Sequence, residues 1–202
     1  MIVLIGGAGK LTDVEATMAA AVVERTVVPV AVECGATLVD GGTDAGIMRY
    51  AGQARAKLAS PIPLVGVAAI GTVTFPGNTE TGADPATLQR DHSHFVFVPG
   101  TEWGAESPWL PRVAGVVAGN QRPVVTVLIN GGAVSLEDVR ASLQAGYPVV
   151  VVRGTGRLAD QLAADAGQGE FADVVGSPHV HFTESGRAEA VRTLLLKVLK
   201  CT

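Results

Sequence analysis

The chain has 202 residues, of which 48% are hydrophobic, 4% are aromatic and 17% are charged, and its formal net charge is −4. This length fits one domain with a sizeable aliphatic core, and we expect residues 1–202 to form a single unit. The negative net charge and the lack of any basic run argue against a protein that binds a nucleic-acid backbone.

Residues 58–79 carry no charged side chain, but prolines and glycines interrupt this stretch too often for a membrane-spanning helix. We therefore expect no membrane segment. The amino terminus enters a strand pattern directly, without a basic leader or a cleavage site, which favours a cytoplasmic location.

Strand and helix patterns alternate along the chain, so we predict an α/β Rossmann-like three-layer domain with a mainly parallel central sheet and helices on both faces. The predicted strands are 2–5, 37–40, 64–70, 94–98, 125–129, 148–152 and 179–182. The predicted helices are 12–34, 44–58, 107–119, 135–145, 158–164 and 184–200. Residues 72–91 lack periodicity and are predicted to form a long loop that serves a ligand.

Two helix details depend on single residues. Pro29 should kink or divide the first helix, because proline has no N–H to donate. Ser135 should cap the helix that it begins, with Glu137 and Asp138 in the first turn, where negative charge suits the helix dipole.

Five predicted strands end in glycine-containing turns, which gather at the carboxyl edge of a parallel sheet. Glycine lets backbone N–H groups approach a ligand there, and the following helix offers the positive end of its dipole, so this edge is a natural anion site. Some of these glycines could serve only as tight turns or helix caps. The turns contain Gly6 and Gly7; Gly41, Gly42 and Thr43; Gly100 and Thr101; Asn130, Gly131 and Gly132; and Gly154, Thr155, Gly156 and Arg157.

Two of these turns carry a cation. The segment 7–12 contains Gly9 and Lys10 but lacks the full spacing of a dinucleotide fingerprint or a Walker loop, so Lys10 is either a phosphate ligand or a solvated surface residue. In the segment 154–157, Arg157 stands at a helix start, where its guanidinium could hold a phosphate in a bidentate manner. The alternative is that Arg157 pairs with Asp160 on the same helical turn.

Histidines and cysteines give weaker signals. His92 with His94, and His179 with His181, form two His-x-His pairs, but no further ligands complete a zinc site, and we interpret them as polar residues at strand ends. We expect Cys34 to be a buried thiol and Cys201 a thiol on a frayed tail, with no disulfide framework.

Three longer motifs resemble a known family. They are Val39 to Met48, then Asp91 to Glu106, and, most strongly, Pro148 to Asp160. Together they are similar to the amino-terminal homology region of melastatin-type TRP channels, whose prokaryotic stand-alone versions belong to the SLOG superfamily (LSDAT type). The resemblance implies a Rossmann-like fold that binds nucleotides or nucleotide-derived ligands such as ADP-ribose.

The same superfamily contains the Lonely Guy phosphoribohydrolases. Gly41 to Met48 is similar to one of their motifs, while Pro99 to Glu106 and Asn130 to Glu137 each match the other in part. This implies an alternative function, an N-glycoside hydrolase acting on a nucleoside monophosphate, with Glu106 or Glu137 as the acid/base. Both glutamates follow glycine-rich turns at predicted helix starts, where the dipole should lower the pKa and disfavour a proton donor.

These observations favour a cytoplasmic nucleotide-binding sensor, in which a nucleoside phosphate or ADP-ribose-like ligand lies at the carboxyl edge. We expect no required cofactor, no metal and no catalytic residue, so the protein is more a ligand-binding domain than an enzyme. An interaction module with a vestigial pocket is a further alternative. The apolar helix 107–119 predicts either a homodimer that buries part of it or packing of this helix under the 72–91 loop. The candidate ligand-binding residues are those of the five turns together with Gly9, Lys10, Gly46, Ile47, Met48 and Glu106.

Overall fold

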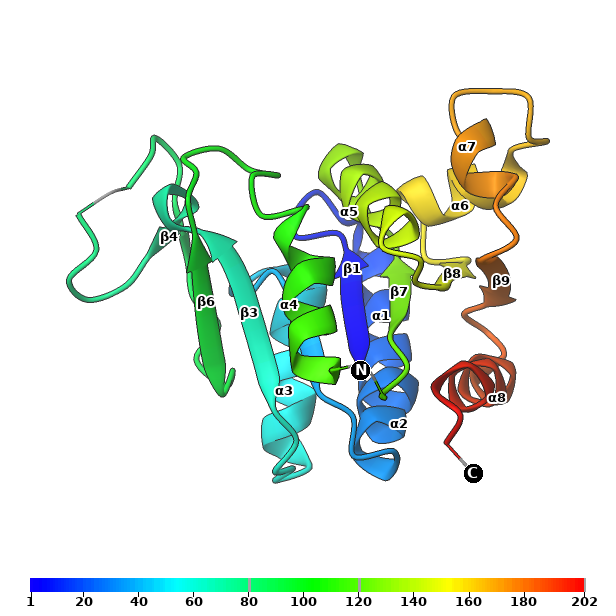
Figure 1. Ribbon diagram of the computed structural model, residues 1–202, viewed down its shortest axis with the longest axis horizontal. Coiled ribbons are helices and arrows are strands. Elements are labelled where there is room, and N and C mark those ends of the chain that lie inside the picture. Colours follow the sequence, from blue (N-terminus) through cyan, green and yellow to red (C-terminus); the bar gives the residue numbers. More distant parts are fainter. Residues whose placement is uncertain (80, 120, 202) are drawn as a thin grey trace.

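The computed structural model describes residues 1–79, 81–119 and 121–201. Seven strands form one sheet in the order β6-β3-β2-β1-β7-β8-β9, and helices cover both of its faces (Figure 1). Every neighbouring pair in this sheet is parallel. The predicted three-layer α/β fold is therefore confirmed.

All seven expected strands are present, with ends within two residues of the prediction. They are β1 (Ile2–Gly6), β2 (Leu38–Asp40), β3 (Leu64–Ala69), β6 (His94–Val98), β7 (Val125–Ile129), β8 (Val149–Arg153) and β9 (Val180–Glu184). The central strands are rich in valine, isoleucine and leucine, because helices bury them on both sides.

Each predicted helical segment contains a helix, but α8 begins later than predicted because β9 extends to Glu184, and α7 is a short addition. They are α1 (Asp13–Val22), α2 (Val28–Glu33), α3 (Gly46–Lys57), α4 (Trp109–Ala118), α5 (Ala133–Gln144), α6 (Arg157–Ala164), α7 (Ala172–Val175) and α8 (Ala188–Leu199). A π-helical turn, η1 (Val23–Val27), joins α1 to α2. In this turn the Val28 N–H bonds to the Val23 oxygen, five residues back, directly before Pro29, which has no N–H to donate to the carbonyl four residues earlier.

Alternate residues of each strand face two separate hydrophobic cores. Ile2 and Leu4 of β1 contact the core shared with α1, α2, α3 and α8, whereas Val3 and Ile5 contact the core shared with α4, α5, α6 and α7. The connection after β1 thus leads to one face and the connection after β7 to the other. Loops that diverge in this way leave a crevice at the carboxyl edge, where ligands bind in open α/β sheets.

The segment predicted as an unstructured loop contains ordered backbone. A 3₁₀ turn, η2 (Ile70–Thr72), is followed by β4 (Val73–Thr74), which pairs in parallel with β5 (Ala86–Thr87). Just after β5, the Gln89 N–H donates to the Gly42 oxygen at 2.9 Å. These pairings are non-local, so the period of the sequence did not indicate them, and they place this segment against the β2–α3 loop.

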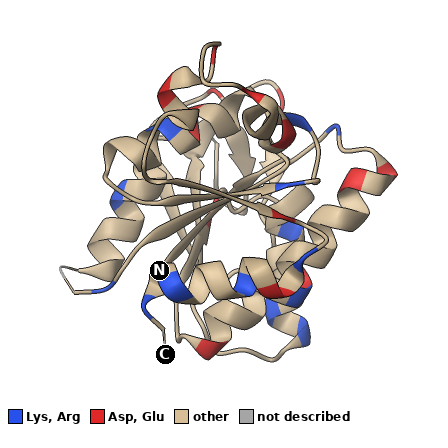
Figure 2. Cartoon of the chain, turned by 90° about the vertical axis from the view of Figure 1, so that its right-hand side faces the viewer, with Lys and Arg blue, Asp and Glu red and all other residues tan. Residues whose placement is uncertain are grey.

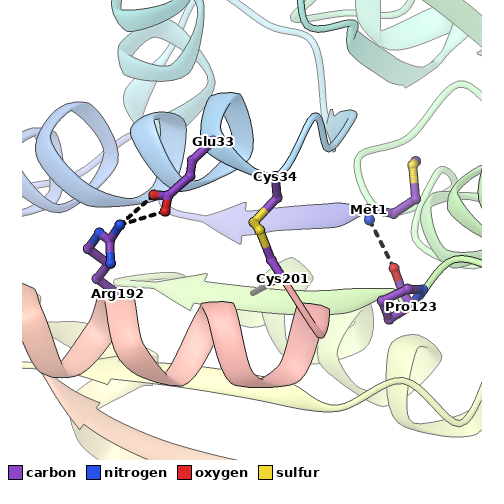
Figure 3. Close-up of a disulfide and its surroundings, with 6 residues drawn as sticks. All are labelled: Met1, Glu33, Cys34, Pro123, Arg192 and Cys201. Atoms are coloured by element: carbon purple, nitrogen blue, oxygen red, sulfur yellow. Dashed lines mark hydrogen bonds and ion pairs between the residues drawn. A yellow bond between two sulfur atoms is a disulfide. The ribbon is translucent and has the colours of Figure 1, made fainter.

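The expectation for the two cysteines is wrong. Cys34, just after α2, and Cys201, just after α8, form a disulfide with a Cα–Cα distance of 5.7 Å (Figure 3). Glu33, next to Cys34, also forms an ion pair with Arg192 of α8, whose Nη2 donates to both carboxylate oxygens (Figure 3). The parallel sheet brings these two helix ends together at its amino edge, across a sequence separation of 167 residues that local pattern cannot bridge.

None of the helices in the described part of the chain is long and apolar enough to cross a membrane.

Candidate functional site at the carboxyl edge

The β1–α1 and β2–α3 loops contact each other closely above the sheet. A Cβ atom at Gly46 would lie 1.8 Å from the Gly7 oxygen, and a Cβ atom at Gly6 would lie 2.0 Å from the Ile129 oxygen. The Ile47 N–H donates to the Gly7 oxygen at 3.2 Å. Glycine at these positions is therefore required by close backbone approach, which accounts for part of the glycine pattern without a ligand.

Asn130 holds the β7 and β8 loops together from a fully buried position. Its Nδ2 donates to the Thr155 oxygen at 2.7 Å, its Oδ1 accepts from the Gly131 N–H at 2.8 Å, and its backbone N–H donates to Thr155 Oγ1 at 2.8 Å. Asn130 has a positive φ of 60°, a conformation that asparagine tolerates better than most residues.

Arg157 reaches across the sheet edge toward the first loop. Its Nη1 donates to the Gly9 oxygen at 3.1 Å, and its Nη2 packs against Gly132, where a Cβ atom would lie 2.5 Å away. Among the described residues, Lys10, Asn130 and Arg157 account for three of the five non-glycine residues with positive φ. Strained backbone of this kind concentrates at functional sites.

Glu15 faces the same place from the first turn of α1. Hydrogen bonds from the Thr12 backbone and hydroxyl, helped by the Arg157 charge and the Asn130 side chain, hold the pKa of the Glu15 carboxyl below its usual value. We call Glu15, Asn130, Thr155 and Arg157 the arginine centre. Sequence reasoning missed Glu15, although the capping box Thr12-x-x-Glu15 was a visible signal.

The β8–α6 loop already holds an internal anion. Asp160 accepts hydrogen bonds from the Gly154 and Gly156 N–H groups, which were predicted to meet a phosphate. Because its carboxylate binds these N–H groups and Arg157 bonds to Gly9, the expected alternative of an Arg157–Asp160 pair is not what the structure shows. A ligand anion at this loop must displace Asp160 or bind on the side of Arg157.

Beneath the β2–α3 loop lies a buried polar network. His92 Nε2 is 2.8 Å from Asp40 Oδ1, with both side chains fully buried, and His92 Nδ1 is 3.0 Å from Gln89 Oε1. Asp40 Oδ1 also accepts from the Gly42 N–H. His92 is therefore a core residue that fixes this loop, whereas His94, at the start of β6, is exposed.

A second group of carboxylates lies where the β6–α4 loop meets α5. We call Glu106, Ser107, Glu137 and Asp138 the acidic cluster. Glu106 accepts from the Gly104 N–H at 3.1 Å, and a Cβ atom at Gly104 would lie 3.2 Å from the Glu137 carboxylate. Within the described chain, Asp138 Oδ1 and Ser107 Oγ are buried without a hydrogen-bond partner.

The acidic cluster overturns the expected effect of the helix dipole. Burial, with a smaller contribution from Glu137, raises the pKa of Glu106, and burial raises the pKa of Asp138 to about 7. Gly132 rather than Ser135 caps α5, so Glu137 and Asp138 lie beyond its first turn. Desolvation therefore decides the direction of the pKa shift at Glu106 and at Asp138.

The remaining candidate residues divide by location. Gly100 and Thr101 contact Gly71 above the β3–β6 end of the sheet, away from the arginine centre. Ile47 and Met48 bury their side chains in a hydrophobic core, and Thr43 is buried as well, which leaves mainly their backbone near the edge. Gly41 has open space around it. In the described ranges, no three His, Cys, Asp or Glu side chains are placed to hold a metal ion.

This geometry defines the class of the protein, a Rossmann-like domain with glycine loops and an arginine at the carboxyl edge of a parallel sheet. A family comparison makes this more specific. The model of the family described as "SLOG in TRPM, prokaryote" matches residues 1–193, so the chain belongs to this family. The family resemblance of its sequence motifs is confirmed.

Relatives agree with this assignment, and solved structures share the fold. The chain is 28% identical to transient receptor potential cation channel subfamily M member 2 from Mus musculus and from Rattus norvegicus, in an alignment that covers 69% of this chain and 12% of each channel. It therefore spans a small part of these relatives. A molybdenum cofactor binding protein from Rippkaea orientalis shares the fold at 15% identity, with a TM-score of 0.59 and 96% of each chain covered. The molybdenum cofactor carrier protein of Chlamydomonas reinhardtii shares it at 17% identity, with a TM-score of 0.60 and the same coverage.

Proposed function

We propose that the protein is a nucleotide-binding sensor domain, whose ligand is a nucleoside phosphate or an ADP-ribose-like molecule. The observation that carries this proposal is the position of Arg157, which crosses from the β8–α6 loop to Gly9 and packs on Gly132, so that one guanidinium serves three loops. A phosphate there would meet Arg157 and the helix starts of α1 and α5. Two structural neighbours are a molybdenum cofactor binding protein and a molybdenum cofactor carrier protein, which supports a ligand-binding role.

Substitution of the arginine tests the proposal. Arg157→Ala should weaken the binding of ADP-ribose or AMP by about 2 kcal/mol, roughly thirty-fold, since it removes a charge-assisted hydrogen bond. Titration calorimetry measures this, and Arg140→Ala, which breaks an exposed ion pair with Asp173, is the matched control. Unchanged affinity in a folded Arg157→Ala protein would contradict the assignment.

The acidic cluster favours the hydrolase as a second candidate function. A general acid must hold a proton near neutral pH, and burial raises the pKa of Asp138 to about 7 and shifts the pKa of Glu106 in the same direction. Release of free base from AMP, abolished by Glu106→Gln, would make the protein an N-glycoside hydrolase. Binding without turnover supports the sensor, and no nucleotide binding at all supports an interaction module.

A homodimer through α4 is also part of the proposal. Val116 is 83% exposed and Val117 45% exposed on this helix, and Arg112 stacks over Trp109. Apolar side chains exposed together in this way favour burial against a second copy. Light scattering at high micromolar concentration should give the mass of a dimer, and a monomer there would reject this part.

The proposed cytoplasmic location is opposed by the Cys34–Cys201 disulfide, because structural disulfides persist mainly in oxidising compartments. For a cytoplasmic protein we expect both thiols to react with an alkylating reagent added at cell lysis. A pair that remains blocked would place the protein in an oxidising compartment.

A further inference from the structure

The disulfide lies at the amino edge of the sheet, opposite the arginine centre, and it borders a cavity. This cavity has a volume of about 310 Å³ and is lined by both Cys34 and Cys201, so we call it the amino-edge cavity. Each cysteine is partly exposed. The volume lies at the lower end of the range for pockets that hold small molecules. A small molecule in this cavity therefore meets the disulfide directly.

Positive charge gathers around the disulfide. Met1, Arg122 and Lys200 line the amino-edge cavity, and none of its described lining residues is Asp or Glu. The Met1 amino group donates to the Pro123 oxygen at 2.9 Å. Burial, and to a lesser extent the charge of Arg122, lowers the pKa of that amino group. Figure 2 shows Lys and Arg positions beside the marked N end of the chain. An anion in the cavity would relieve this repulsion between cations.

Two of these cations are available to a ligand. Arg122 and Lys200 are exposed, and neither forms an ion pair within the described ranges of the chain. The carboxylate of Glu33, next to Cys34, is already engaged by Arg192. Because arginine and lysine bind carboxylates through charge-assisted hydrogen bonds, a ligand that carries carboxylates suits this lining.

The disulfide adds a reactive group to this binding surface. Exchange begins when a thiolate, rather than a thiol, reaches one of the two sulfur atoms. A thiol whose carboxylates bind Arg122 and Lys200 would hold its own sulfur beside the disulfide, and the same positive charges would favour its ionised form. The cavity therefore combines recognition of an anion with the position that exchange requires.

The fold keeps the two cysteines together when the bond between them is broken. Leu195 and Leu199 of α8 and Val30 of α2 are buried in one hydrophobic core. The ion pair between Glu33 and Arg192 joins the same two helices. Since neither contact depends on the disulfide, the free thiols stay adjacent and the bond can form again. Exchange at this site is therefore reversible.

We propose that the amino-edge cavity binds a small thiol that carries carboxylate groups and exchanges it with the Cys34–Cys201 disulfide. The bound thiolate attacks Cys34 Sγ and forms a new S–S bond, while the Cys34–Cys201 bond breaks. Cys201 leaves as a thiolate beside Lys200, which favours its departure, and then takes a proton from water.

A second molecule of the small thiol completes the exchange. Its thiolate attacks the small-molecule sulfur of the mixed disulfide, and Cys34 leaves as a thiolate that is protonated in turn. Two small thiols are thus oxidised to their disulfide, and the protein disulfide is reduced by the same two electrons. The reverse reaction restores the Cys34–Cys201 bond. This site is separate from the proposed nucleotide site, and neither depends on the other.

Reduction by two thiols of equal length but different charge tests the proposal. The probes are 3-mercaptopropionate and 3-mercaptopropanol at equal thiolate concentrations, and alkylation followed by mass spectrometry measures the loss of the disulfide. The anionic probe should react at least about ten-fold faster at low salt, and high salt should reduce this preference. In urea, where the cavity is lost, the preference should disappear, which controls for the intrinsic reactivity of the probes.

Charge variants assign the preference to the cavity. A double variant, Arg122→Gln with Lys200→Gln, should abolish it, whereas Arg122→Lys with Lys200→Arg should retain it. Arg25→Gln with Arg90→Gln changes the net charge equally at exposed positions outside the lining, and should also retain it. Equal rates for both probes with the folded unmodified protein overturn the proposal. So do a preference that survives Arg122→Gln with Lys200→Gln, and an air-oxidised protein without the disulfide.

Discussion

The arginine centre and the acidic cluster place carboxylates on helices at the same edge of the sheet, but in opposite surroundings. Glu15 is partly exposed and accepts hydrogen bonds from Thr12 beside Arg157, which lowers its pKa. Asp138 is buried, its Oδ1 has no partner within the described residues, and its pKa rises to about 7. Hydrogen-bond donors around Glu15 and burial around Asp138 therefore set the opposite directions in which their pKa values move.

The largest expected effect is on the unfolding free energy, which should depend on pH through Asp138 of the acidic cluster. Because the folded protein holds the Asp138 proton more tightly than the unfolded chain, ionisation of Asp138 destabilises the fold as pH rises from about 4 to about 7. Asp138→Asn should therefore match the unmodified protein at pH 4 and exceed its unfolding free energy at pH 8 by about 4 kcal/mol. Urea unfolding at both pH values measures this.

Equal stability of the Asp138→Asn and unmodified proteins at pH 8 would contradict the burial of an ionisable Asp138. Asp173→Asn is the matched control. Asp173 is an exposed partner of Arg140 whose pKa is lowered by that hydrogen bond, so its loss should give no gain in stability at pH 8.

The second prediction concerns the stability that the buried hydrogen bonds of Asn130 contribute in the arginine centre. Asn130→Ala leaves the Thr155 oxygen and the Gly131 N–H unpaired and puts alanine at a positive φ, so it should cost about 3 kcal/mol of unfolding free energy. Gln53→Ala on the exposed side of α3 should change it by less than about 0.5 kcal/mol. A loss below about 1 kcal/mol would show that these bonds contribute little.

The smallest effect should come from Glu15 and should have the opposite pH dependence to Asp138. A folded-state pKa below the usual 4.5 adds stability above that pH, which is lost as pH falls through the folded-state value. Glu15→Gln keeps a side chain that suits a capping box but removes the charge, so its stability should vary less with pH below 4.5. Denaturant unfolding at pH 3, 4 and 6 measures the difference, and identical profiles would contradict it.

Much of the fold could be predicted from the sequence, because its signals are local. Runs such as Val125 to Ile129 indicate buried parallel strands, and Pro29 interrupts the first helix by removing a donor. The glycine turns after the strands also placed the candidate site at the carboxyl edge, since parallel strands end at one edge whatever their order.

What only the tertiary structure decided are the partners of residues far apart in the chain. The sequence could not show that Cys201 meets Cys34, that His92 is buried beside Asp40, or that Arg157 bonds to Gly9. It also could not show which carboxylates are buried, so the pKa of Glu106 was expected in the wrong direction. Periodicity and turn chemistry are properties of neighbouring residues, whereas burial and long-range pairing exist only after the sheet has brought distant segments together.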